Sequence, residues 1–111
     1  MGGEIDRLIS KQGTSDPDVT EAMVREFNAP VYRLALSILN DAEDAQDVTQ
    51  DTFIQAAIHL DHYQVGTNFK AWLFTIAVNN CRMILRRRTT RKTLHKVWLA
   101  LTQGSPAPPG P

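Results

Sequence analysis

Four polar side chains that can donate hydrogen bonds recur at helical spacing in the last third of the sequence. They stand at i, i+4, i+7 and i+11 and are Thr75, Asn79, Arg82 and Arg86. A denser basic cluster follows directly and consists of Arg87, Arg88, Arg91 and Lys92. Hydroxyl, amide and guanidinium groups donate to phosphate oxygens and to base edges, so a helix face of this composition indicates nucleic-acid binding. The alternative is a solvated face whose cations only favour the C-terminal end of the helix.

Charges are segregated along the chain, although the formal net charge is zero. Residues 4–61 hold all twelve Asp and Glu against four Lys or Arg, a net charge of −8. Residues 62–111 hold eight Lys or Arg and no acid, a net charge of +8. This asymmetry predicts two partners of opposite sign, or an acidic half that shields the basic half.

Three aromatic residues lie at or beside the glycine-containing loop that precedes the polar stripe: Tyr63, Phe69 and Trp72. Aromatic rings beside a cationic helix are the platform on which single-stranded bases stack. For Phe69 and Trp72 the alternative is a place in the hydrophobic core, whereas the polar neighbours of Tyr63 favour an exposed ring.

The acidic half carries a helix face that does not resemble a core. On a helix over residues 41–60, one wide side is expected to be buried. The opposite side contains Asp44, Asp47, Asp51, Ile54 and Ile58. An apolar patch with a rim of carboxylates is typical of a protein interface with a basic partner. Alternatively, an N-terminal helix covers both isoleucines.

The spacing of the apolar residues predicts an all-α fold, a compact bundle of three main helices with short flanking helices. The main helices are expected at about residues 18–40, 41–60 and 68–88, the first of them bent near Pro30. No strand pattern is present. The positions that predict a short fourth helix are Leu94, Val97, Trp98 and Leu101.

The expected domain organisation follows from these elements. Residues 1–17 are interpreted as an N-terminal helix and turn, and residues 18–92 as the functional domain. Residues 93–111 are interpreted as a short helix and a Pro/Gly-rich linker, because the ending QGSPAPPGP cannot form a packed core.

Catalytic and metal-binding chemistry has little support in the sequence, which contains no nucleophile elbow, phosphate loop or paired-carboxylate signature. The single cysteine, Cys81, excludes an internal disulfide and is expected to be a small buried thiol. His59 and His62 beside Asp61 could hold a metal, but no third and fourth ligands follow at a recognisable spacing. We therefore expect no enzyme, no metal and no cofactor.

A membrane location is also not expected. No stretch approaches the roughly 18 consecutive apolar residues of a membrane span. The start MGGEIDR lacks the order of a signal peptide. We expect a cytoplasmic protein.

Two blocks of sequence carry a resemblance to a known family. They are APVYRLALSILNDAEDAQDVTQDTFIQAA and GTNFKAWLFTIAVNNCRMILRRR. Together they resemble the second conserved region of bacterial sigma factors, closest to the extracytoplasmic-function group of the sigma-70 type. The resemblance covers about residues 23–90 and depends on several motifs, among them DAEDxxDxxQDxF, FxxWLxxIAxN and their spacing across a glycine loop.

The resemblance implies roles for the faces described above. In this family the acidic helix docks on the coiled coil of the largest subunit of RNA polymerase, and the matching positions are Asp47, Gln50 and Asp51, with Ile54 nearby. The family's loop opens promoter DNA and holds an unstacked base of the minus-10 element, which implies that role for residues 63–68, including Gly66, Thr67 and Asn68. Phe69 and Trp72 are implied to support this loop.

The third main helix is implied to read or brace the minus-10 element as a single strand. The implied residues are Thr75, Asn79, Asn80 and Arg82, with Arg86, Arg87 and Arg88 on the DNA backbone. The helical wheel puts Asn80 on the apolar side, where it would complete the packing instead.

The 111 residues lack the family's second DNA-binding domain, which reads the minus-35 element, so we expect this chain alone to be a poor initiator. Residues 93–102 are more hydrophobic than a free linker, which predicts that they fold back on the domain or contact an anti-sigma factor. Two other functions are open: a helical protein-interaction domain without specific DNA recognition, and an enzyme built around His59, Asp61 and His62.

Overall fold

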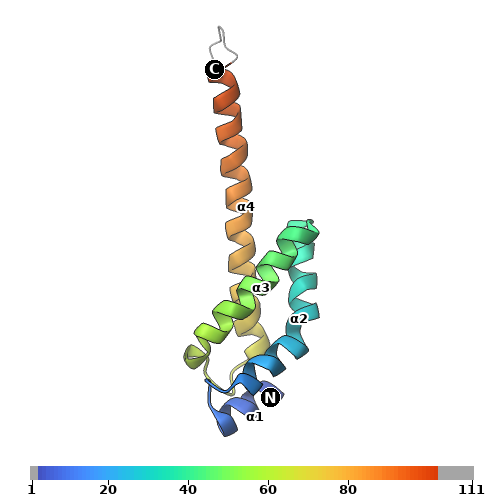
Figure 1. The fold of residues 1–111 in the computed structure, drawn as a ribbon, viewed down its shortest axis with the longest axis vertical. Coiled ribbons are helices and arrows are strands. Elements are labelled where there is room, and N and C mark those ends of the chain that lie inside the picture. Colours follow the sequence, from blue (N-terminus) through green and yellow to red (C-terminus); the bar gives the residue numbers. More distant parts are fainter. Residues whose placement is uncertain (1–2, 103–111) are drawn as a thin grey trace. The chain divides into compact units, whose positions relative to one another are not determined.

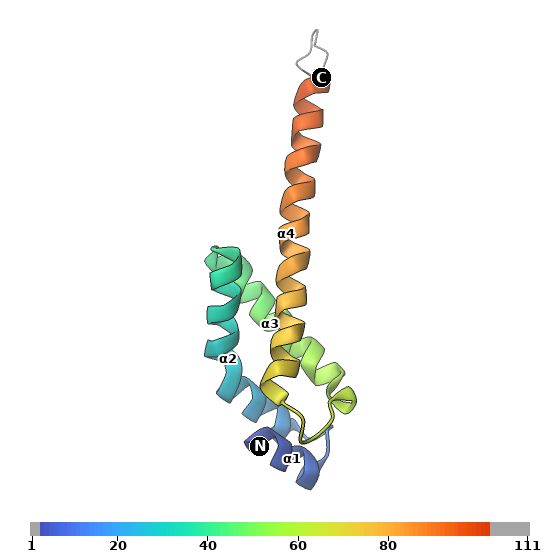
Figure 2. The same ribbon diagram turned by 180° about the vertical axis from the view of Figure 1, so that it is seen from behind.

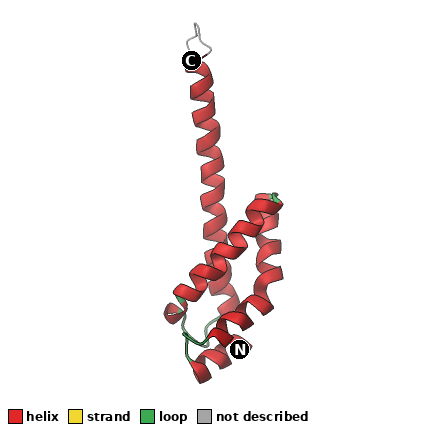
Figure 3. Cartoon of the chain, viewed as in Figure 1, coloured by secondary structure: helices red, strands yellow, loops and turns green. Residues whose placement is uncertain are grey.

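The computed structural model describes residues 3–102, and within that range every regular element is a helix (Figure 3). In chain order these are α1 (Glu4–Gln12), α2 (Pro17–Leu39), α3 (Ala42–Ile58), the short 3-10 helix η1 (Leu60–His62) and α4 (Phe69–Thr102). The all-α fold predicted from the sequence is confirmed.

Local sequence explains where the first helices begin and end. Asp16 caps α2, its carboxylate accepting from the Asp18 amide at 2.8 Å, and Pro17 stands where a helix needs no backbone donor. Pro30 lies inside α2, and the ribbon changes direction near its middle (Figure 1). Asn40 ends the helix in the left-handed conformation, with φ of 52°.

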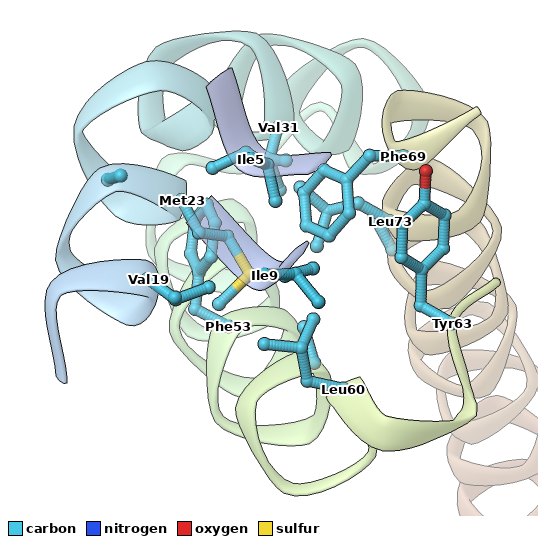
Figure 4. Packing of buried hydrophobic residues seen from close by; sticks show 13 residues of the cluster. Ile5, Ile9, Val19, Met23, Val31, Phe53, Leu60, Tyr63, Phe69 and Leu73 are labelled. Atoms are coloured by element: carbon cyan, nitrogen blue, oxygen red, sulfur yellow. The ribbon is translucent and has the colours of Figure 1, made fainter. Parts of the chain in front are cut away.

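The core lies between α1, α2, α3 and the first turns of α4 (Figure 4). Its fully buried large side chains include Val19, Met23 and Val31 of α2, Leu60 of η1 and Leu73 of α4. Two isoleucines of α1 also join this core, Ile5 and Ile9. Both ribbon views show α1 beside the N-terminal half of α2 (Figures 1 and 2).

The chain divides into two compact units, of which the first ends at Cys81 and the second begins at Arg82. Helix α4 extends to Thr102, further than the expected end at residue 88, so residues 94–101 are its last turns and not a separate helix. The physical reason is that residues 69–102 contain neither Gly nor Pro to interrupt the helix. The expected linker at residues 103–111 lies outside the described residues.

Candidate functional site

The acidic face of α3 is open. Asp41 caps the helix by accepting from the Asp44 amide at 2.8 Å. Further along, Ile54 is 52% exposed and Ile58 is 66% exposed, because α1 packs on the core through its own isoleucines. The alternative in which the N-terminal helix covers these two residues is therefore wrong.

Carboxylate and amide groups surround the two isoleucines. Asp47, Gln50 and Asp51 are exposed, and Asp44 is half-buried. We call the set of Asp44, Asp47, Gln50, Asp51, Ile54 and Ile58 the α3 surface. It has the composition of an interface for a basic partner, with an apolar centre and an acidic rim.

A hollow of about 980 Å³ adjoins this surface and is lined by both α2 and α3. Helix α2 contributes Thr20, Val24, Asn28 and Tyr32 to its wall, and Asp47, Gln50 and Ile54 belong to the opposite side. The contribution of α2 was missed in the sequence. The available signal was that Val24 directly follows Met23, because two adjacent apolar residues of a helix cannot both point to the core.

The loop of residues 63–68 has a fixed hydrogen-bonded form. The Thr67 hydroxyl donates to the Gln64 carbonyl at 2.6 Å, and Asn68 caps α4 by accepting from the Ala71 amide at 3.0 Å. Gly66 has a φ of 92°, which L side chains rarely adopt. Gly66, Thr67 and Asn68 are exposed, so a ligand can reach this part of the loop.

The aromatic residues form one cluster, and most of it is buried. Tyr63 contacts Phe69 edge-on at 5.2 Å between ring centroids, and Trp72 lies 5.5 Å from Tyr63 and 5.6 Å from Phe69. Tyr63 is 6% exposed and Phe69 is 7% exposed, whereas Trp72 is half-buried. The expected exposed ring of Tyr63 is therefore wrong, because the ring belongs to the buried core cluster and packs on Phe69 (Figure 4).

Tyr63 also forms a long-range hydrogen bond that the sequence did not indicate. Its hydroxyl donates to Asp6 Oδ1 at 2.7 Å. Burial raises the pKa of Tyr63 above its ordinary value, and the hydrogen bond to Asp6 raises it further. The phenol is therefore a neutral donor near neutral pH.

Two neighbouring asparagines of α4 have different environments. Asn79 is exposed, as is Thr75 one turn earlier. Asn80 is 9% exposed and donates from Nδ2 to the Thr52 hydroxyl at 3.2 Å. The structure thus supports the packing role for Asn80, which leaves Thr75 and Asn79 as the accessible polar groups of this part of α4.

In the second unit, the described residues 82–102 carry the basic cluster. Arg82, Arg86 and Arg87 are exposed, and Arg88 is half-buried. A shallow hollow of about 490 Å³ on this segment is lined by Met83, Arg86, Arg87, Thr90, Arg91 and Leu94. No acid occurs in this segment, so its positive field is not neutralised from within.

The remaining candidate groups are two histidines and the cysteine. The rings of His59 and His62 stack at 5.5 Å between centroids, and residues 3–102 hold no group of three His, Cys, Asp or Glu placed to bind a metal. Cys81 is buried as predicted, and burial raises its pKa. Across the described residues, no helix is both long and apolar enough to cross a bilayer.

Comparison with known proteins gives one family match and several relatives of the same kind. The family model of Sigma-70 region 2 matches residues 23–91. The ECF RNA polymerase sigma factor SigE of Mycolicibacterium smegmatis is 40% identical over 68 residues, which are 61% of this chain and 26% of that protein. The ECF RNA polymerase sigma factor SigW of Bacillus subtilis is 28% identical over 75 residues, 68% of this chain and 40% of that protein.

A third relative is aligned over more of the chain. The RNA polymerase sigma factor CnrH of Cupriavidus metallidurans is 32% identical over 92 residues, which are 82% of this chain and 48% of that protein. The chain therefore spans less than half the length of each of these three relatives.

Proposed function

Because the chain belongs to the sigma-70 region 2 family, among the extracytoplasmic-function sigma factors, we propose that it binds RNA polymerase core and recognises and melts the minus-10 promoter element. It has no catalytic activity of its own in this proposal. The observation that carries the proposal is the family match over residues 23–91, which includes both the α3 surface and the polar face of α4. Residues 18–92 form the sigma domain in this interpretation, flanked by residues 1–17 and 93–111.

The α3 surface is the proposed polymerase site. Its proposed partner is the coiled coil of the largest polymerase subunit, with Ile54 and Ile58 as apolar anchors. Asp47 and Asp51 stand at the rim, where exposed carboxylates accelerate association with a basic partner and select against an acidic one. The adjoining hollow, with Val24 and Tyr32 in its wall, provides room for a side chain of the partner.

The proposed DNA site has an exposed part and a buried support. The groups proposed to contact DNA are Gly66, Thr67, Asn68, Thr75, Asn79, Arg82, Arg86, Arg87 and Arg88. Tyr63, Phe69 and Asn80 support them from the core, since their side chains are buried. Trp72 is half-buried and contributes one accessible part of the aromatic cluster.

A regulator is the proposed partner of the last turns of α4. Leu94, Val97, Trp98 and Leu101 are each at least half exposed. A row of large apolar side chains in water is a typical protein-binding feature. We propose an anti-sigma factor for this row, and the same row is the observation that favours the second candidate function, a protein-interaction domain without DNA specificity.

One binding experiment separates these two functions. Short single-stranded DNA oligonucleotides of varied sequence are titrated with the chain, with and without RNA polymerase core, at several salt concentrations. The sigma proposal expects binding that depends on sequence and strengthens when core is present. Binding that depends on salt alone, without affinity for core, would support the protein-interaction domain instead.

A further inference from the structure

One carboxylate of α1 is buried, although it belongs to neither the proposed polymerase site nor the proposed DNA contacts. Asp6 is 6% exposed, and it is the one buried residue among the Asp, Glu, Lys and Arg of residues 3–102. It precedes the segment matched by the family, which begins at residue 23. Burying an ionised group is unfavourable unless hydrogen bonds compensate it, so the partners of Asp6 indicate its role.

Both oxygens of this carboxylate bind the loop of residues 63–68. Oδ1 accepts from the Tyr63 hydroxyl at 2.7 Å, and Oδ2 accepts from the Gly66 amide at 3.2 Å. The two donors lie 57 and 60 residues away in sequence. One side chain of α1 therefore connects to the loop at two points, one on each side of residues 64 and 65.

These two bonds determine where the exposed residues of the loop stand. Tyr63 is fixed at the start by its ring contacts with Phe69 and Trp72, and Asn68 is fixed at the end as the cap of α4. Between these ends, Gly66 is held by Asp6 in a left-handed conformation with φ of 92°. A glycine without such an anchor samples many backbone conformations.

Helix α1 and the loop also share a surface. A hollow of about 220 Å³ is lined by Glu4 and Asp6 from α1 and by Thr67, Asn68 and Lys70 from the loop and the start of α4. The position of α1 therefore affects the shape of the surface next to Thr67 and Asn68.

We infer that Asp6 is a positioning residue, whose carboxylate holds the loop in the one conformation that presents Gly66, Thr67 and Asn68 to an unstacked DNA base. The inference rests on the proposed function and deepens it, since it makes α1 part of the base-selecting apparatus. It assigns no DNA contact to Asp6 itself. Polymerase binding through the α3 surface does not depend on it.

Four variants test the inference. Asp6→Ala removes both acceptors, whereas Asp6→Asn keeps one acceptor oxygen and turns an NH₂ group toward the other donor. Tyr63→Phe keeps the ring and removes one bond. Glu21→Gln is the matched control, because it removes one negative charge at an exposed residue of α2.

Three quantities are measured on each variant. The first is the affinity for oligothymidylates in which one position at a time carries each of the four bases, so that the ratio of the best to the worst affinity gives the base preference. The second is the affinity for RNA polymerase core. The third is the hydrogen-exchange rate of the Gly66 amide by NMR, which reports its bond to Asp6 directly. A general loss of folding reduces all affinities together, whereas a displaced loop changes the base preference alone.

We expect Asp6→Ala to reduce the base preference about tenfold, as the loss of hydrogen bonds to a charged group implies, and to accelerate Gly66 exchange. Asp6→Asn and Tyr63→Phe should give intermediate losses, and Glu21→Gln should stay within about twofold of the wild type. Core affinity should be unchanged throughout.

Two results would overturn the inference alone: a wild-type base preference that persists in Asp6→Ala, or a Gly66 exchange rate that this change does not alter. A wild-type chain without any base preference would overturn the proposed function together with it.

Discussion

At the residue scale, Asn79 and Asn80 have the same side chain in opposite environments. Asn80 is bonded to the buried Thr52, and Asn79 faces solvent. We expect Asn80→Ala to lower the free energy of unfolding by about 1–3 kcal/mol, because it leaves a buried hydroxyl without its donor. Asn79→Ala should change it by less than about 0.5 kcal/mol and instead reduce the preference for one DNA sequence.

Urea unfolding and oligonucleotide titration of both variants check this prediction. Each asparagine is the control for the other, since the two changes delete the same atoms one position apart. An Asn80→Ala protein of wild-type stability, or an Asn79→Ala protein with full sequence preference, would contradict the assigned roles.

Cys81 makes the free energy of unfolding depend on pH. Burial raises the pKa of its thiol above the ordinary value of 9.0, so the folded state retains the proton while the unfolded chain loses it. The free energy of unfolding is therefore unaffected below about pH 9 and falls as the pH rises from there toward the folded-state pKa. Tyr63, whose pKa is also raised by burial, adds a loss of the same sign above about pH 10.

Urea unfolding between neutral and alkaline pH, with Cys81→Ala as the comparison, measures this effect. The wild type should lose more stability than the variant as the pH rises, and the variant should keep the part due to Tyr63. Parallel pH profiles for the two proteins would show that the thiol does not contribute.

At the scale of elements, the acids of α3 face solvent and not the core. Because Asp47 and Asp51 are exposed, Asp47→Lys or Asp51→Lys should leave the unfolding transition unchanged. Each should weaken binding to polymerase core by about tenfold at low salt, with a smaller loss at high salt as screening increases. Asp61→Lys, an equal charge change at an exposed residue of η1, is the matched control for surface charge.

The affinity of each variant for RNA polymerase core, measured at two salt concentrations, tests this prediction. If Asp61→Lys weakened core binding as much as the α3 variants did, the effect would come from net charge and not from the α3 surface.

We expect the last turns of α4 to contribute nothing to the stability of the core. Residues 91–102 are all exposed, so a chain that ends after Lys92 should lose helical signal in circular dichroism without a lower free energy of unfolding. The same truncation should abolish binding of an anti-sigma factor if the row from Leu94 to Leu101 is its site. A large loss of stability on truncation would indicate that these residues pack on the domain.

At the scale of the whole molecule, the pattern of the sequence determined more of the fold than of the site. Helical spacing of Met23, Val31 and their neighbours predicted α2, and the turn at Asn40 separated it from α3. Local patterns cannot report which helices meet, so the exposure of Ile54 had two possible outcomes until the position of α1 was known. The same limit explains Tyr63, whose hydroxyl binds a carboxylate 57 residues earlier in the chain.

The segregated charge of the chain implies a specific dependence on salt. Residues 62–111 carry a net charge of +8, and Arg82, Arg86 and Arg87 are exposed in a segment without acids. Cations that bind phosphates release counterions, so for single strands each lost contact should reduce the slope of log affinity against log salt by about 0.7. Arg86→Ala and Arg87→Ala should therefore weaken binding to every oligonucleotide alike and lower this slope.

Asn79→Ala provides the contrast, since a neutral amide releases no counterion when it binds a base edge. It should reduce sequence preference at an unchanged slope. Titrations of these three variants with a preferred and a scrambled oligonucleotide at several salt concentrations measure both quantities. A slope that stays constant when either arginine is removed would mean that the basic end of α4 does not contact the DNA backbone.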